Sequence, residues 1–226
     1  PDGNPVAMVH CNNCTSDINA WAQVFAQFQQ LMGQPADMGT IFTRLFQVAL
    51  EGDADCGGVL AYNYISGEPV TGLSEGRPMV VRSPQDRFTL ANLMRSHLYA
   101  AVCGLKIGND ILFNEEKIAV DRITGHGGYF KTPGVGARIL AAALSSPISV
   151  METAGEGGAW GIALLACYMV KGGGQPLDQW LDSAIFAGSK SVEIAPSPED
   201  VAGFNAYISS FTRGLAIERA AVACKA

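Results

Sequence analysis

Two glycine turns, each placed after a predicted strand, constrain this chain more than any other feature. Between Ile123 and Tyr168 the sequence predicts strand, glycine turn, helix, short strand, glycine turn and helix. Glycine lets backbone approach a ligand closely, because no Cβ is in the way. A helix that follows such a turn points its N-terminal amides at the same spot. The pattern therefore favours an α/β protein with a nucleotide site outside the carboxyl ends of its strands.

Each turn also has a simpler interpretation. The first, at residues 125–132, contains Gly127 and Gly128, and a plain strand-to-helix turn explains it equally well. It has neither the G-x-G-x-x-G of a dinucleotide fold nor the G-x-x-x-x-G-K-[ST] of a P-loop. The second, at residues 152–161, is also typical of two helices that pack closely. Glu152 and Glu156 are acid/base candidates there, but no nucleophile is paired with them.

Composition excludes several classes of protein. A net charge of -6 over 226 residues argues against a nucleic-acid-binding surface, and no run of Lys and Arg indicates a membrane anchor. The longest apolar run, residues 159–170, is too short to span a bilayer and predicts a buried helix. We see no signal peptide, although Pro1 is not a natural start residue. The six cysteines are expected to be reduced, which favours a cytoplasmic location.

The remaining elements alternate between strands and helices, which predicts a layered α/β fold. Strands are expected at residues 6–9, 57–64, 79–81, 118–124 and 192–194, and helices at residues 16–32, 41–50, 88–113, 159–170, 177–186 and 196–223. Residues 66–78 are rich in Gly, Pro and Glu and predict a long, solvated loop.

Near the amino end stands the motif His10-Cys11-Asn12-Asn13-Cys14. A C-x-x-C pair is found in zinc sites and in redox sites. A zinc site needs further ligands, and the sequence offers neither a second C-x-x-C nor a clustered histidine pair. We therefore favour a strand end that turns into a helix at the edge of a cleft. His10, Asn12 and Asn13 would then contact a polar ligand.

The ordered motifs of the chain resemble a known family. They are Tyr64–Glu68, with its Ser-Gly-Glu, the long helix through Asn92–Leu105, the glycine turn Ile123–Thr132, and Ala154–Ala166. In order and spacing this set is similar to the carboxyl-terminal half of the FGGY carbohydrate kinases, from about residue 10 to about residue 207. The resemblance implies the fold of actin, hexokinase and the heat-shock ATPases, in which two ribonuclease-H-like domains close on ATP and substrate.

The same resemblance implies roles for particular residues. Residues 1–226 would form a single domain, the nucleotide-side half of a two-domain sugar kinase that uses ATP and Mg²⁺. The amino-terminal domain, with the catalytic aspartate, would lie outside this chain. The implied sugar is a pentulose, touched by His10 or Asn13, and a homodimer is one of the states allowed. The implied adenosine pocket consists of Gly127, Gly128, Tyr129, Lys131 and Thr132, with Ser83 beside the nucleotide.

A second hypothesis remains open at this stage. The same fold also serves proteins that bind nucleotide without catalysing transfer, as sensing or assembly modules. In that case an exposed apolar helix around Phe204–Ile217 would be the partner surface.

Overall fold

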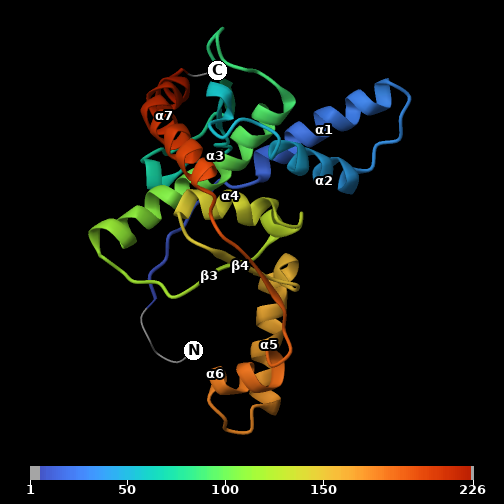
Figure 1. Ribbon diagram of the computed structural model, residues 1–226, viewed down its shortest axis with the longest axis vertical. Helices are drawn as coiled ribbons and strands as arrows, with labels where there is room; N and C mark the ends of the chain where they lie inside the picture. Colours follow the sequence, from blue (N-terminus) through green and yellow to red (C-terminus); the bar gives the residue numbers. More distant parts are fainter. Residues whose placement is uncertain (1–5, 225–226) are drawn as a thin grey trace.

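The computed structural model describes residues 6–224, apart from the side chain of Glu156. Figure 1 shows a helical body with a hairpin of helices projecting to one side and a second helical extension below it. The helices are α1 (Ser16–Leu31), α2 (Met38–Ala49), α3 (Leu90–Asp110), α4 (Val135–Leu144), α5 (Gly157–Lys171), α6 (Leu177–Trp180) and α7 (Pro198–Ala223), and the strands are β1 (Leu60–Tyr62), β2 (Met79–Val81), β3 (Ile123–Gly125), β4 (Ile148–Met151) and β5 (Ser191–Ile194).

Helix α3 forms the centre of the body. The side chain of Thr89 caps its first turn by accepting a hydrogen bond from the amide of Asn92 at 3.1 Å. From Asn92 to Gly104 every residue is buried, because α2, α4, α7 and β1 pack around it. The predicted helix over residues 88–113 is confirmed. A short π-helical segment, Ile111–Glu115, follows it directly.

The strands form two small sheets. Strands β1 and β2 pair antiparallel, whereas β3 and β4 pair parallel and β5 joins β4 antiparallel. Helix α4 connects β3 to β4, as the strand, turn, helix and strand order predicts. The prediction of a strand over residues 118–124 was too long. Only Ile123–Gly125 pairs with a neighbour, and the exposed residues before it have no strand to pair with among the described residues.

Helix α7 packs closely against the body of the protein at two of its glycines. A Cβ atom on Gly203 would collide with the backbone of Ala54, and one on Gly214 would collide with the hydroxyl of Tyr62. The close approach buries one face of the helix completely, and this face comprises Phe204, Tyr207, Phe211 and Leu215. The hypothesis that this helix offers an exposed partner surface was therefore wrong, because the chain's own core covers its apolar face.

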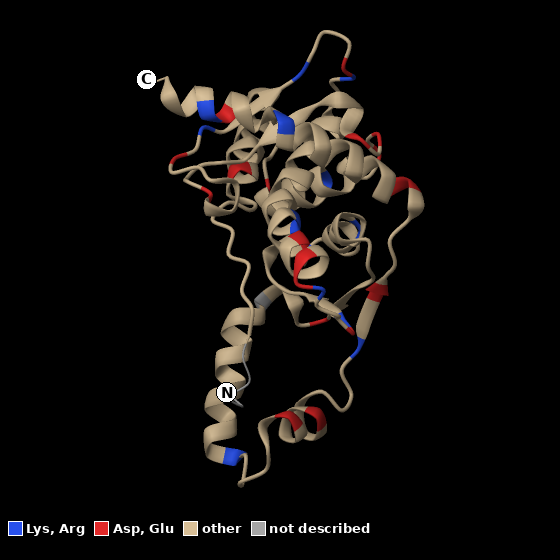
Figure 2. Ribbon diagram, turned by 90° about the vertical axis from the view of Figure 1, so that its left-hand side faces the viewer, with Lys and Arg blue, Asp and Glu red and all other residues tan. Residues whose placement is uncertain are grey.

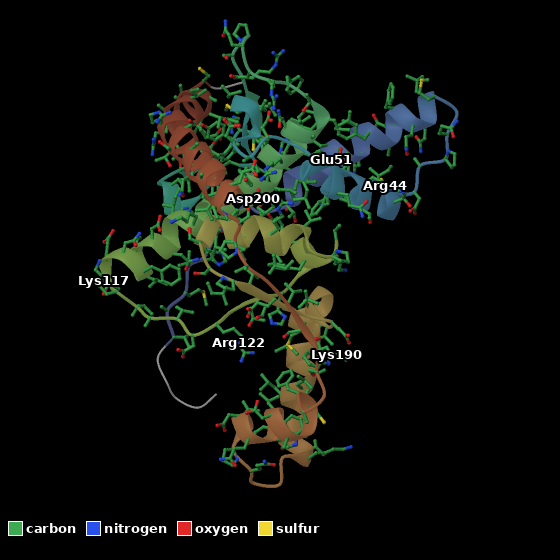
Figure 3. The ribbon with its side chains drawn as sticks, viewed as in Figure 1. Arg44, Glu51, Lys117, Arg122, Lys190 and Asp200 are labelled. Carbon is green, nitrogen blue, oxygen red and sulfur yellow. The ribbon has the colours of Figure 1, made fainter. Side chains whose placement is uncertain are left out.

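A buried ion pair holds the start of α7 to the core at Asp200, which Figure 3 labels. Asp200 and Arg95 are each 2% exposed, and the Asp200 Oδ1 lies 2.6 Å from an Arg95 guanidinium nitrogen. Arg138 of α4 donates to the other carboxylate oxygen, also at 2.6 Å. A buried carboxylate is stable only when paired with cations or hydrogen-bond donors. This ion pair therefore holds helices α3, α4 and α7 together.

Helix α5 does not lie in the core. The apolar run that it contains predicts a buried helix, yet none of its described residues is buried, and Met169 and Val170 are more than 80% exposed. Figure 2 shows the helix leaving the body as a stretch without charge until Lys171. It packs on the following segment through Trp160 with Phe186 and Tyr168 with Trp180. Within residues 6–224, no helix combines the length and hydropathy needed to cross a bilayer.

Two further expectations failed near the amino end. Residues 6–9 form no strand, and Val6 and Met8 are more than 80% exposed. Val9 instead packs against Gly108 of α3, where the absence of a side chain leaves room for it. The loop at residues 66–78 is also less solvated than predicted, because Glu68 is 1% exposed.

Candidate nucleotide site

The two glycine turns lie side by side at the carboxyl ends of the parallel strands β3 and β4. The amide of Gly127 donates a hydrogen bond of 2.7 Å to the carbonyl of Ala154 in the second turn. A Cβ on Gly157 would lie 3.0 Å from that of His126, so the second helix starts in direct contact with the first turn. The two glycine turns singled out in the sequence are therefore adjacent in the structure, at the carboxyl ends of neighbouring parallel strands.

The backbone of the first turn faces open space. Gly127 has φ +101, a conformation that side chains rarely adopt, whereas Gly128 has no such restriction. A Cβ on either residue would have no heavy atom within 4 Å. The open face is therefore not needed for packing inside this chain, and it leaves room for a ligand against the backbone.

A pocket of about 350 Å³ opens beside this turn, and we call it the turn pocket. Lys131 and Thr132 line it, together with Glu152 of the second turn. Thr132 is 8% exposed and precedes the first turn of α4, so the start of that helix forms one wall. The other walls are apolar and consist of Phe130, Ala137, Val150, Met151, Val192 and Ile194. A mostly apolar pocket with a few polar groups in its lining suits a flat heterocycle such as adenine.

The apolar walls from β4 and β5 were not among the predicted site residues. Val192 and Ile194 alternate with polar residues, a pattern typical of a strand, although Val192 is 64% exposed. The sequence does not show that β5 pairs with β4, so it does not show which pocket the strand lines. The pairing of Ile148 with Ile194 brings the strand there.

Tyr129 supports the turn from inside the core. It is 7% exposed, and its hydroxyl donates a hydrogen bond of 2.9 Å to the carbonyl of Leu98. Burial raises the pKa of this hydroxyl well above its ordinary value, so it stays a neutral donor. Tyr129 therefore anchors the turn to α3.

A second cavity, of about 500 Å³, lies on the other side of Phe130. It brings His10 together with Gly125, His126 and Tyr129 of the first turn. We call it the His10 cavity. Of the residues predicted to contact substrate, His10 is thus adjacent to the glycine turn, and it is exposed.

Cys11 and Cys14 also line the His10 cavity, as free thiols. Burial, with smaller effects of Glu68 and Cys14, raises the pKa of Cys11 to about 11. A redox-active thiol needs a lowered pKa, so this environment does not favour thiolate chemistry. Among residues 6–224 there is no group of three or more His, Cys, Asp or Glu side chains arranged to hold a metal ion.

Asn13 does not face a cavity. Its side chain is 4% exposed, and its Oδ1 accepts hydrogen bonds from the amides of Ile65 and Ser66 at 3.0 and 3.1 Å. Its Nδ2 donates to the buried carboxylate of Glu68 at 3.2 Å, and the amides of Asn12 and Asn13 donate to the same oxygen. Asn13 and Glu68 together clamp the Ser66–Glu68 loop to the amino-terminal segment. No local sequence pattern predicts this pairing, because it joins residues far apart in the chain.

Comparison with known proteins identifies the family. A sequence model of the FGGY family of carbohydrate kinases, C-terminal domain, matches residues 1–170. The chain belongs to the FGGY carbohydrate kinases. The comparison with curated proteins gives no match.

Solved FGGY kinases share the fold. The gluconate kinase of Lactobacillus acidophilus superposes with a TM-score of 0.66 at 17% identity, over 92% of this chain and 39% of that one. The xylulose kinase of Rhodospirillum rubrum gives 0.62 at 19% identity, over 92% and 38%. The glycerol kinase of Plasmodium falciparum, solved with ADP, gives 0.54 at 16% identity, over 88% and 37%. The fold is that of the actin- and hexokinase-like ATPases, and this chain spans less than two fifths of the length of these relatives.

In this FGGY domain Ser83 lies apart from the other predicted nucleotide contacts. It is exposed in the loop between β2 and α3, where its amide bonds to the carboxylate of Asp86. This loop lies at the top of Figure 1, whereas β3 and the turns lie in the lower half. Ser83 lines a separate shallow hollow with Val80 and Pro84. The structure brings Lys131 and Thr132 to the turn pocket, but it does not bring Ser83 there.

Proposed function

We propose that residues 1–226 form the nucleotide-side domain of an ATP-dependent carbohydrate kinase. The observation that carries the proposal is the open backbone face of Gly127 and Gly128 beside the turn pocket. Family membership supports the reaction class, which is transfer of the γ-phosphoryl group of ATP to a sugar hydroxyl. The domain that completes the kinase would lie outside this chain and would carry the catalytic aspartate.

The residues of the site fit a nucleotide. We assign the adenosine to the turn pocket, with its base between the apolar walls and Thr132 within reach of the ribose or base. The backbone of Gly127 and Gly128 would pass directly along the ligand, since no side chain stands there. Lys131 lies at the rim, where its charge suits an anionic group, and Tyr129 holds the turn in place.

In this account the chain contributes binding and orientation. It holds the leaving nucleotide while the sugar attacks in line, and closure of the complementary domain would exclude water. Mg²⁺ bound with the nucleotide would neutralise phosphate charge during transfer. Because the described residues form no metal cluster, we assign no metal ligand to this chain.

We propose that the sugar is a pentulose. Several similar structures are xylulose kinases, although gluconate and glycerol kinases match comparably well. His10 is the candidate sugar contact, because it is exposed and lines a cavity shared with the glycine turn. Asn13 would act indirectly, by holding the Ser66–Glu68 loop through its hydrogen bonds.

The test of the site is a titration of Mg-ADP monitored by calorimetry. Replacing Gly128 by leucine fills the open face without forcing a forbidden φ, so the fold is retained and binding is lost. Gly188 is a matched control, since it also has open space around its Cβ position but lies outside both glycine turns. Gly188→Leu should bind as the wild type does. Equal affinity in Gly128→Leu and wild type would show that the nucleotide does not lie against this turn.

A further inference from the structure

The segment that carries His10 is held on one side by a distant carboxylate. The backbone amides of Asn12 and Asn13 donate hydrogen bonds of 2.9 and 3.1 Å to one oxygen of Glu68. The side chain of Asn13 donates a third, of 3.2 Å, to the same oxygen. Glu68 lies in the loop between β1 and β2, 55 residues beyond Asn13. These three donors therefore fasten the backbone that follows His10 to another part of the fold.

On its other side the segment packs into helix α3 at two glycines. The side chain of Val9 occupies the space that a Cβ on Gly108 would need. The sulfur of Cys11 lies 3.2 Å from the Cβ position of Gly104, one turn earlier on the helix. His10 stands between these two anchored residues, is itself exposed, and lines the His10 cavity. Its place at the cavity is therefore set by its neighbours.

The surroundings of Glu68 are unfavourable for stability. Glu68 is 1% exposed, its Oε1 has no hydrogen-bond partner among the described residues, and within residues 6–224 no cationic side chain forms an ion pair with it. A buried carboxylate without a counter-charge costs stability, and such exceptions concentrate at functional sites. What Glu68 does supply is a fixed position for the segment that carries His10.

We propose that Glu68 and Gly108 are positioning residues for the sugar. They hold the segment Val9–Asn13 so that His10 reaches its ligand, and neither is among the residues that line the His10 cavity. This inference rests on the proposed function, since it takes the sugar to bind against His10. Misplacing a contacting group by about 1 Å can cost on the order of a hundredfold. The turn pocket contains neither of these residues nor any part of the segment, so nucleotide binding should not depend on them.

The first test compares two replacements of Glu68 in the complete protein, by ADP release from Mg-ATP at varied ketopentose concentration. Glu68→Ala leaves three N–H groups without their acceptor and should raise KM for the sugar by roughly tenfold or more. Glu68→Gln keeps one oxygen for these donors, so its KM should stay within about threefold of the wild-type value. In both variants KM for Mg-ATP and the calorimetric affinity for Mg-ADP should stay within about twofold. Glu75→Ala, at an exposed position of the same loop, is the matched control and should change neither KM.

A second test displaces the same segment from the opposite side, so it does not depend on how well Glu68→Ala folds. Gly108→Ala places a methyl group against Val9 and should also raise KM for the sugar by roughly tenfold. Adding Val9→Ala removes the methyl groups of Val9 that the new side chain meets. The double variant should therefore return to within about threefold of the wild-type KM, whereas a general packing defect in α3 would not be rescued at this position.

The outcomes separate this inference from the function on which it rests. A rise confined to KM for the sugar, with recovery in Glu68→Gln and in the Gly108→Ala, Val9→Ala double variant, supports the positioning role. An active wild type whose sugar KM is unchanged in both Glu68→Ala and Gly108→Ala overturns that role and leaves the proposed function standing. Equal rises in KM for the sugar and for Mg-ATP overturn it too, because the variants would then disturb the whole domain. A wild type without sugar-dependent release overturns the proposed function, and this inference with it.

Discussion

Replacing Asp200 by asparagine removes the charge that two arginines share in the core. Asp200 begins α7, and its oxygens accept hydrogen bonds from Arg95 of α3 and Arg138 of α4. Arg95 is 2% exposed and also donates to the carbonyl of Gly52 and the hydroxyl of Tyr99. In the variant this guanidinium remains buried without its counter-charge.

Two estimates give the loss in the free energy of unfolding: the pKa shift of Asp200, and the typical cost of breaking a buried ion pair. Burial by itself would raise the pKa of Asp200, but the hydrogen bonds from Arg138 and Arg95 outweigh it and lower the pKa from 3.8 to about 2. At 1.36 kcal/mol for each pH unit, this fall corresponds to about 2.5 kcal/mol at neutral pH. Removing one partner of a buried pair typically costs about 3–5 kcal/mol, because the other charge is left unpaired. We therefore expect Asp200→Asn to lower the free energy of unfolding by about 3 kcal/mol.

Urea unfolding followed by circular dichroism measures this loss. Glu199→Gln is the matched control, since it removes the same charge from the same helical turn at an exposed position, and it should change stability by less than about 0.5 kcal/mol. Because the pKa of Asp200 is depressed, its contribution is complete above about pH 4 and is lost as the pH falls through about 2. A loss below about 1 kcal/mol at pH 7 for Asp200→Asn would refute the argument.

Two smaller predictions follow from close packing and from burial. Gly203→Ala should lower the free energy of unfolding by about 1–3 kcal/mol in the same urea assay, because the new methyl group meets the backbone of Ala54, and an unchanged midpoint would show that α7 is not seated as described. Cys11 should react with iodoacetamide at pH 7.5 more slowly than the exposed Cys224, because its pKa is raised to about 11, and mass spectrometry of the alkylated peptides would contradict this if Cys11 were modified first.

Local signals in the sequence predict the parts of the site that depend on neighbouring residues. Gly127 and Gly128 follow a strand, and their spacing to Gly155 and Gly157 places two turns at the ends of adjacent parallel strands. One βαβ unit carries both turns, so the contact between them follows from chain order alone. The long helix α3 is predictable for a similar reason, since its apolar residues recur at helical spacing.

The failed predictions depend on partners that lie far along the chain. An apolar run such as residues 159–170 can form a buried helix only where a surface exists to cover it, and here two aromatic pairs with the following segment leave every described residue of α5 at least partly exposed. The sequence around Glu68 predicts a solvated carboxylate, because its hydrogen-bond partner Asn13 lies far away in the chain. The apolar wall of the turn pocket is completed by β5, whose pairing with β4 cannot be deduced from the composition of either strand.

Release of ADP from Mg-ATP by the complete protein shows whether this chain belongs to an active sugar kinase that binds its nucleotide at the glycine turn. We would measure it against a panel of ketopentoses, aldonates and polyols, with the Gly128→Leu and Gly188→Leu variants in parallel. We expect release to depend on one class of sugar, the ketopentoses, and we expect Gly128→Leu to lose the activity while Gly188→Leu keeps it. Absence of sugar-dependent release with every compound, or undiminished release by Gly128→Leu, would contradict the account.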